Sequence, residues 1–148
     1  MLRLNLPAFE YHLQESRDGQ LLIWDVLRRQ HVVLTPEEWV RQHFINYLLQ
    51  DLAIPRTLMR LEAPLRYGSL TKWADILAYD RQGNPLLMVE CKASTVAIDQ
   101  DTLLQLSVYD SAVHAPYLVL TNGLAHHYLY QDRSGVRWLS ELPLFGEM

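Results

Sequence analysis

The stretch LLMVECKA, residues 86–93, decides how the rest of the sequence is interpreted. It starts as an apolar run typical of a buried strand, and Glu90 and Lys92 then interrupt that run. Charged side chains rarely lie inside an apolar strand unless another group pairs with them. Because side chains alternate along a strand, we expect Glu90 and Lys92 on one face and Cys91 on the other.

Two further strands are expected immediately before this one, at residues 57–65 and 72–79. The segment DRQGNP, residues 80–85, has the composition of a turn, so the strands on either side of it should pair as a hairpin. The three strands together are therefore expected to form an antiparallel meander.

A helix should precede the meander. Thr35 is a suitable N-cap, Pro36 suits the first helical position, and Glu38 completes a capping box. Apolar residues then recur at helical spacing, so the helix is expected to end near Asp51.

The second half of the chain predicts one more helix, at about 101–112, followed by strands at 117–120 and 125–130. A strand that returns after a helix favours a right-handed crossover to a parallel partner. Residues 21–34 suggest an additional hairpin at the edge of the domain. The expected fold class is α/β, a mixed sheet flanked by helices in a single domain of residues 1–148, with its core at about 35–130.

Composition excludes several classes of protein. The chain has 148 residues, 49% apolar and 20% charged, which is ordinary for a globular domain. No apolar run reaches the length of a membrane span, and a lone cysteine excludes an internal disulfide, so a cytoplasmic location is expected by default. The net charge of -4 gives no general attraction to nucleic acid.

The chemistry centres on Asp75, which is expected to share a face with Trp73 and Leu77. In an ordinary hairpin register Asp75 lies across from Glu90 or diagonal to it. Two close carboxylates repel each other, and a divalent cation such as Mg²⁺ removes that penalty. The alternative from the residues alone is a structural ion pair that Lys92 makes with Glu90 or Asp75.

Asp75, fourteen residues and then Glu90-Cys91-Lys92 resemble the motif of the PD-(D/E)xK nuclease superfamily, whose core has the element order expected here. The chain more closely resembles the N-terminal nuclease domain of type I restriction enzyme R proteins. The stretches that carry this likeness are Ala74-Asp75-Ile76-Leu77, Val89-Glu90-Cys91-Lys92-Ala93, Leu120-Thr121-Asn122-Gly123 and Gln105-x-x-x-Tyr109.

The resemblance implies a restriction-endonuclease-like core and a site that hydrolyses phosphodiester bonds in DNA. Asp75, Glu90 and the backbone carbonyl of Cys91 would be ligands of Mg²⁺, for which Mn²⁺ can substitute, and Lys92 would be the catalytic lysine. Gln105 and Tyr109 would face the DNA backbone or the metal site. An acid on the first helix often approaches the metal in related nucleases, which makes Glu38 the candidate and Glu37 the reserve.

Type I R proteins carry a helicase motor, whereas these residues contain no Gly-x-x-x-x-Gly-Lys-Ser/Thr loop. A protein partner that supplies motor function or specificity is therefore expected. Two other functions compete with a metal-dependent DNA nuclease. One is a non-catalytic module of the same fold that binds nucleic acid or protein. The other is a two-carboxylate glycosidase, which ranks last because it gives Lys92 no role.

Overall fold

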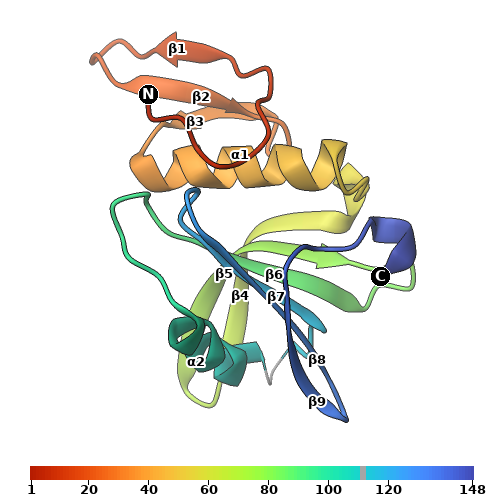
Figure 1. Ribbon diagram of the computed structural model, residues 1–148. Coiled ribbons are helices and arrows are strands. Elements are labelled where there is room, and N and C mark those ends of the chain that lie inside the picture. The colour runs from red at the N-terminus through yellow and green to blue at the C-terminus, as the bar shows by residue number, and fades with distance from the viewer. Residues whose placement is uncertain (111–112) are drawn as a thin grey trace.

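The structure is a computed structural model that describes residues 1–148 except 111–112, together with all side chains but those of residues 67 and 108–112. Its centre is a six-stranded sheet in the order β4-β5-β6-β7-β8-β9 (Figure 1). Helix α1 (Pro36–Gln50) lies on one face of this sheet, and helix α2 (Gln100–Asp110) lies on the other. A smaller sheet, β1-β2-β3, covers the outer side of α1.

The strands of the central sheet follow the expected mixed topology. Strands β4 (Met59–Tyr67), β5 (Leu70–Tyr79) and β6 (Pro85–Cys91) form the antiparallel meander. Strand β7 (Tyr117–Thr121) pairs parallel with β6 after the crossover through α2. Strands β8 (His126–Asp132) and β9 (Gly135–Leu139) then continue the sheet antiparallel. The α/β class and the order of the core elements are confirmed.

Two strands were not expected from the sequence. The N-terminal hairpin consists of β2 (Leu21–Asp25) and β3 (Gln30–Val33), as predicted, but β1 (Leu13–Glu15) adds a third strand. All residues of β1 are exposed, and four of the five residues of β9 are. Neither strand therefore carries the apolar alternation by which a buried face is predicted.

Helix α1 begins as predicted, because the Thr35 hydroxyl accepts a hydrogen bond from the Glu38 amide at 3.0 Å. The Glu38 carboxylate instead takes hydrogen bonds from Arg28, Arg41 and Gln42. Helix α2 ends at Asp110, and the last two residues predicted for it, 111–112, lie outside the described residues. No helix in the described part of the chain is long and apolar enough to cross a membrane.

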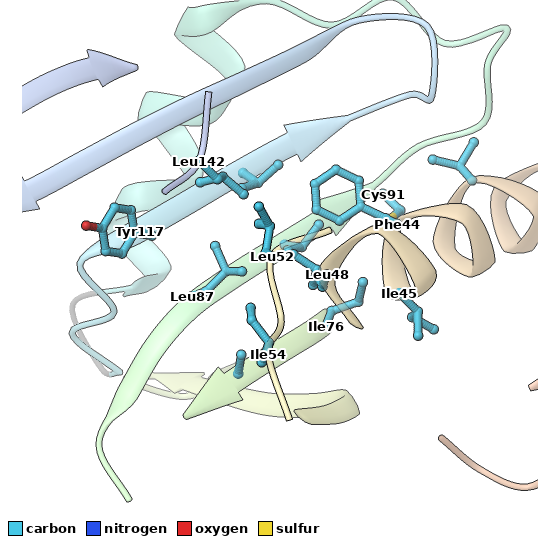
Figure 2. Close-up of a cluster of buried hydrophobic side chains, with 14 of the residues drawn as sticks. Phe44, Ile45, Leu48, Leu52, Ile54, Ile76, Leu87, Cys91, Tyr117 and Leu142 are labelled. Carbon is cyan, nitrogen blue, oxygen red and sulfur yellow. The ribbon is translucent and has the colours of Figure 1, made fainter. Parts of the chain in front are cut away.

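The core has two parts, one on each face of the sheet. The cluster under α1 contains Phe44, Ile45 and Leu48 from the helix, and Leu87 and Cys91 from β6 (Figure 2). Val89 of β6 belongs to the same cluster. The cluster under α2 contains Leu103 and Leu106 with Met88 of β6. From Leu87 onward, residues of β6 therefore alternate between the two clusters as expected, which puts Cys91 under α1 and leaves Glu90 to the α2 side.

The predicted alternation fails on β4 and β5 at one shared position. Ala74 belongs to the cluster under α2 and Ile76 to the cluster under α1, although two residues apart on a regular strand share a face. On β4, Leu61 and Ala63 change sides in the same way. The register of β4 with β5 sets Glu62 opposite Asp75, between these residues, and Glu62 has a left-handed φ of 51°. The expectation that Asp75 shares a face with Trp73 and Leu77 is therefore wrong.

Candidate active site

The site begins where β5 and β6 stop pairing. Their regular register ends at Ile76 opposite Val89, and one more step would set Asp75 opposite Glu90. The carboxylate of Asp75 now accepts the Cys91 amide at Oδ2, 2.7 Å away. The break in alternation at Asp75 thus turns its carboxylate toward the end of β6, and the acids of the predicted motif lie on neighbouring strands.

Lys92 follows directly at the end of β6. Its amide donates to the Thr121 carbonyl at 2.8 Å, which fixes the backbone against β7. Its Nζ lies 3.5 Å from Glu90 Oε1, and the Lys92 side chain is 37% exposed whereas that of Glu90 is 12% exposed. Glu90 is therefore held largely out of solvent, while the Lys92 side chain reaches it.

Both acids resist ionisation. Burial, and next the charge of Glu90, raise the pKa of Asp75 to about 7, although the Cys91 amide and Arg41 oppose the shift. Burial also raises the pKa of Glu90, against the opposing charges of Lys72 and Lys92. The exposed Glu37 raises the pKa of both carboxylates. A positive charge placed between Asp75 and Glu90 would relieve this repulsion.

Arg41 of α1 is the buried cation nearest to Asp75. Its Nη1 lies 3.7 Å from Asp75 Oδ1, and its Nη2 lies 3.4 Å from Oε1 of Glu62. Its Nε donates to Oε2 of Glu38 at 2.9 Å. One guanidinium thereby connects carboxylates from α1, β4 and β5.

The small N-terminal sheet contributes a second arginine to the same network. Arg28, in the β2–β3 turn, donates to Asp25 at 2.7 Å and to Glu38 at 3.0 Å. Gln42 joins Asp25 to Glu38 through its Nε2, while its buried Oε1 has no hydrogen-bond partner within the described structure. The N-terminal sheet is thus connected to Asp75 through Arg28, Glu38 and Arg41.

The two acids considered on the first helix lie in different surroundings. Burial alone would raise the pKa of Glu38, but hydrogen bonds and charge from Arg41, with help from Gln42 and Arg28, lower it. Glu38 is therefore an ionised carboxylate whose oxygens already bind cations. Glu37 is exposed beside it, and both line a cleft of about 400 Å³ together with Thr35, Pro36, Arg41 and Ala93. This cleft lies between the start of α1 and the end of β6.

Cys91 contributes its backbone and not its thiol. The thiol is buried in the cluster under α1, and burial raises its pKa well above the usual value, so it stays protonated. A protonated, inaccessible thiol is not a nucleophile. The backbone amide orients Asp75, and the role of the carbonyl as a ligand stays a prediction.

Gln105 and Tyr109 both belong to α2, as predicted. The Gln105 side chain is exposed, and none of the described contacts connects it to Asp75, Glu90 or Lys92. The side chain of Tyr109 lies outside the described residues. Their predicted role toward DNA or metal therefore stays a prediction.

The donor atoms present suit a hard divalent cation. Within the part of the chain that the structure describes, no group of three His, Cys, Asp or Glu side chains is arranged to hold a metal ion. Mg²⁺, however, is usually bound by only one or two carboxylates, with waters and substrate phosphates completing its shell. Two partly buried carboxylates, one with a pKa of about 7, fit that pattern.

Several residues of the site were not singled out from the sequence. Arg41 had one available signal, its position three residues after Glu38 on the same helix face. Arg28 had none, because its partner Glu38 is ten residues away on another element. Glu62 had none either, because its left-handed backbone is not encoded by a glycine or an asparagine.

Comparisons with known proteins identify the family and the fold. The chain matches the family model described as the type I restriction enzyme R protein N terminus over residues 36–143. Residues 1–35, which include Asp25 and Arg28, lie outside that match. No curated protein sequence matches the chain.

Among solved structures, the fold is similar to that of a fragment assigned as an HsdR subunit of a type I restriction enzyme from Vibrio vulnificus YJ016. The two are 22% identical with a TM-score of 0.53, and the match covers 77% of this chain and 24% of the other. The chain thus spans about a quarter of the length of that relative. By the family match, which takes in most of the sequence, the protein belongs to the type I restriction enzyme R protein N-terminus family.

Proposed function

We propose that the protein is a PD-(D/E)xK-type nuclease that hydrolyses phosphodiester bonds in DNA with Mg²⁺ as its cofactor. The observation that carries the proposal is the convergence of Asp75, Glu90 and Lys92 at the divergence of β5 and β6. Membership of the R protein N-terminus family supports it.

In this proposal Asp75 and Glu90 hold the ion, together with the Cys91 carbonyl. When bound, Mg²⁺ polarises a phosphoryl group and lowers the pKa of a coordinated water. The Cys91 amide keeps Asp75 oriented, and the sheet holds Glu90 in place. A preorganised ligand set of this kind loses little entropy when it binds the ion.

In this proposal Lys92 acts on the substrate, and its exposure supports that role. Its side chain is the most exposed of the three, and its backbone amide is fixed by the Thr121 carbonyl. The ammonium can donate a hydrogen bond to the attacking water or to a phosphoryl oxygen on which charge develops. DNA would enter along the cleft between α1 and β6, with Gln105 and Tyr109 of α2 as further contacts.

The second candidate is a binding module of the same fold, and one observation favours it. Each acid already has a cation beside it, Arg41 for Asp75 and Lys92 for Glu90, as in a structural ion-pair cluster. A larger assembly with a motor-bearing partner, as in type I restriction enzymes, would suit either function.

A cleavage assay separates the two functions. Purified protein is incubated with supercoiled plasmid and with a labelled single strand, in Mg²⁺, in Mn²⁺ and in EDTA. We expect metal-dependent cleavage that Asp75→Asn and Lys92→Met each reduce by at least about a hundredfold, the scale of losing an electrostatic or acid–base group. Arg133→Ala, in the exposed β8–β9 turn, is the matched control and should keep full activity.

DNA binding measured on the same variants completes the experiment. If cleavage survives in Lys92→Met, the proposed mechanism is wrong. If wild-type protein binds DNA or a partner but cleaves nothing with either metal, the binding module is the correct function.

A further inference from the structure

We infer that Arg41 is an internal counter-ion of Asp75 and that its charge lowers the affinity of the site for a divalent cation. The inference rests on the proposed function, because it assumes that Asp75 is a metal ligand. It assigns a role to an arginine that the nuclease motif does not include, and it ties the N-terminal sheet to the chemistry of the site.

The geometry around Arg41 differs on its two sides. Toward Glu38 its guanidinium makes two hydrogen bonds, from Nε at 2.9 Å and from Nη2 at 2.5 Å. Toward Asp75 its Nη1 makes only a looser ion pair at 3.7 Å. The two hydrogen bonds to Glu38 hold Arg41 in place. The longer ion pair with Asp75 therefore neutralises that carboxylate only in part and leaves it able to bind another cation.

Arg28, from the N-terminal sheet, stabilises the contact between Arg41 and Glu38. It shares Oε1 of Glu38 with Arg41 and is itself fixed by Asp25. Two arginines on one buried carboxylate limit how far Arg41 can move toward Asp75. A matched neighbour is available, because Arg29 is exposed in the same turn and makes none of these contacts.

The physical consequence concerns metal affinity. Arg41 and a divalent cation both neutralise Asp75 and repel each other. The charge of Arg41 therefore lowers the affinity of the site for the metal ion. Removing the arginine charge should tighten metal binding, whereas a lost structural support would loosen it or leave it unchanged. The direction of the change in metal affinity therefore distinguishes an electrostatic role of Arg41 from a purely structural one.

The experiment is calorimetric titration of the full chain with Ca²⁺ and with Mn²⁺, in the absence of DNA, so that no turnover is needed. We expect Arg41→Met to lower the dissociation constant by about three- to tenfold, a modest electrostatic effect at a partly buried pair. Arg41→Lys keeps the charge but loses the paired hydrogen bonds to Glu38, so its dissociation constant should lie closer to that of wild type than to that of Arg41→Met. Arg29→Met should not differ from wild type.

Arg41→Gln is the second variant if Arg41→Met does not fold, because a glutamine can still hydrogen-bond to Glu38 without a charge. A Glu38→Gln variant tests whether Glu38 is itself a metal ligand or acts through Arg41. If Glu38 acts through Arg41, most of its effect on metal affinity should vanish in the Glu38→Gln, Arg41→Met double variant. If the effect of Glu38→Gln persists at full size in that background, Glu38 binds the ion directly, and its assigned role as the anchor of Arg41 is overturned.

The outcomes separate this inference from the proposed function. Metal binding to wild type with unchanged or weaker binding to both charge-removing Arg41 variants refutes the counter-ion role alone. Absence of metal binding to wild-type protein in this titration refutes both.

Discussion

The raised pKa of Asp75 makes the stability of the protein depend on pH in a direction that can be measured. The perturbation is Asp75→Asn, which keeps the shape and an oxygen that can accept the Cys91 amide but cannot ionise. In the folded protein the pKa of Asp75 rises from 3.8 to about 7, through burial first and the charge of Glu90 second. Between these values the folded state binds a proton that the unfolded state has released, so the wild type loses stability as pH rises.

The size of the effect follows from the shift. Each pKa unit corresponds to about 1.4 kcal/mol, so the full shift is worth about 4 kcal/mol, and relaxation of the site reduces the expected value to about 2–4 kcal/mol. At pH 3.5, below the unfolded-state pKa of 3.8, the two proteins should have similar free energies of unfolding. At pH 8.5, without divalent cation, Asp75→Asn should be the more stable protein by that amount.

The assay is urea unfolding followed by tryptophan fluorescence in EDTA, at five or more pH values for both proteins. Comparing the two proteins cancels the contributions of His43 and His126, whose pKa values burial lowers and which act in the opposite direction. A difference between wild type and variant that stays constant within about 0.5 kcal/mol across this range would refute the reasoning. Saturating Mn²⁺ should abolish the alkaline loss in the wild type.

The remaining predictions concern the framework of the site. Arg28→Met should lower the free energy of unfolding in urea by about 2–4 kcal/mol, because it leaves Asp25 and Glu38 buried with one cation fewer. The control Arg29→Met should lower it by less than about 0.5 kcal/mol. Equal losses in the two variants would contradict the ion-pair network. Thr35→Ala should cost about 1 kcal/mol through the lost cap, and Thr35→Ser should restore most of it. In native protein the Cys91 thiol should react with iodoacetamide only as fast as the chain unfolds, and rapid labelling without denaturant would contradict its burial.

The sequence predicted the parts of the fold that rest on local signals. Thr35 and Pro36 mark the start of α1, the turn before Pro85 marks the hairpin, and the apolar run of β6 marks the central strand. Each follows from cap chemistry, turn chemistry or the period of a strand, which neighbours in the chain determine. The crossover to β7 followed from the general handedness of parallel connections.

The orientation of the site was not predictable in the same way. Asp75 does not follow the alternation of its strand, because β4 and β5 change faces together at Glu62 and Asp75. The ion pairs of Arg28 and Arg41 join elements that are distant in sequence, and no local pattern reports such contacts. The exposed strands β1 and β9 were not predicted, because they lack the apolar alternation of a strand with one buried face.

The central claim is that Asp75 and Glu90 together hold a divalent cation. The most direct test is the melting temperature of the wild type and of Asp75→Ala during titration with Mg²⁺ and Mn²⁺ at pH 8. At a hundred times the dissociation constant, binding should stabilise the native state by about 2.7 kcal/mol, a rise of roughly 5–10 °C for a domain of this size. The account predicts that rise for the wild type and none for Asp75→Ala. A flat titration of the wild type, or an equal rise in both proteins, would contradict it.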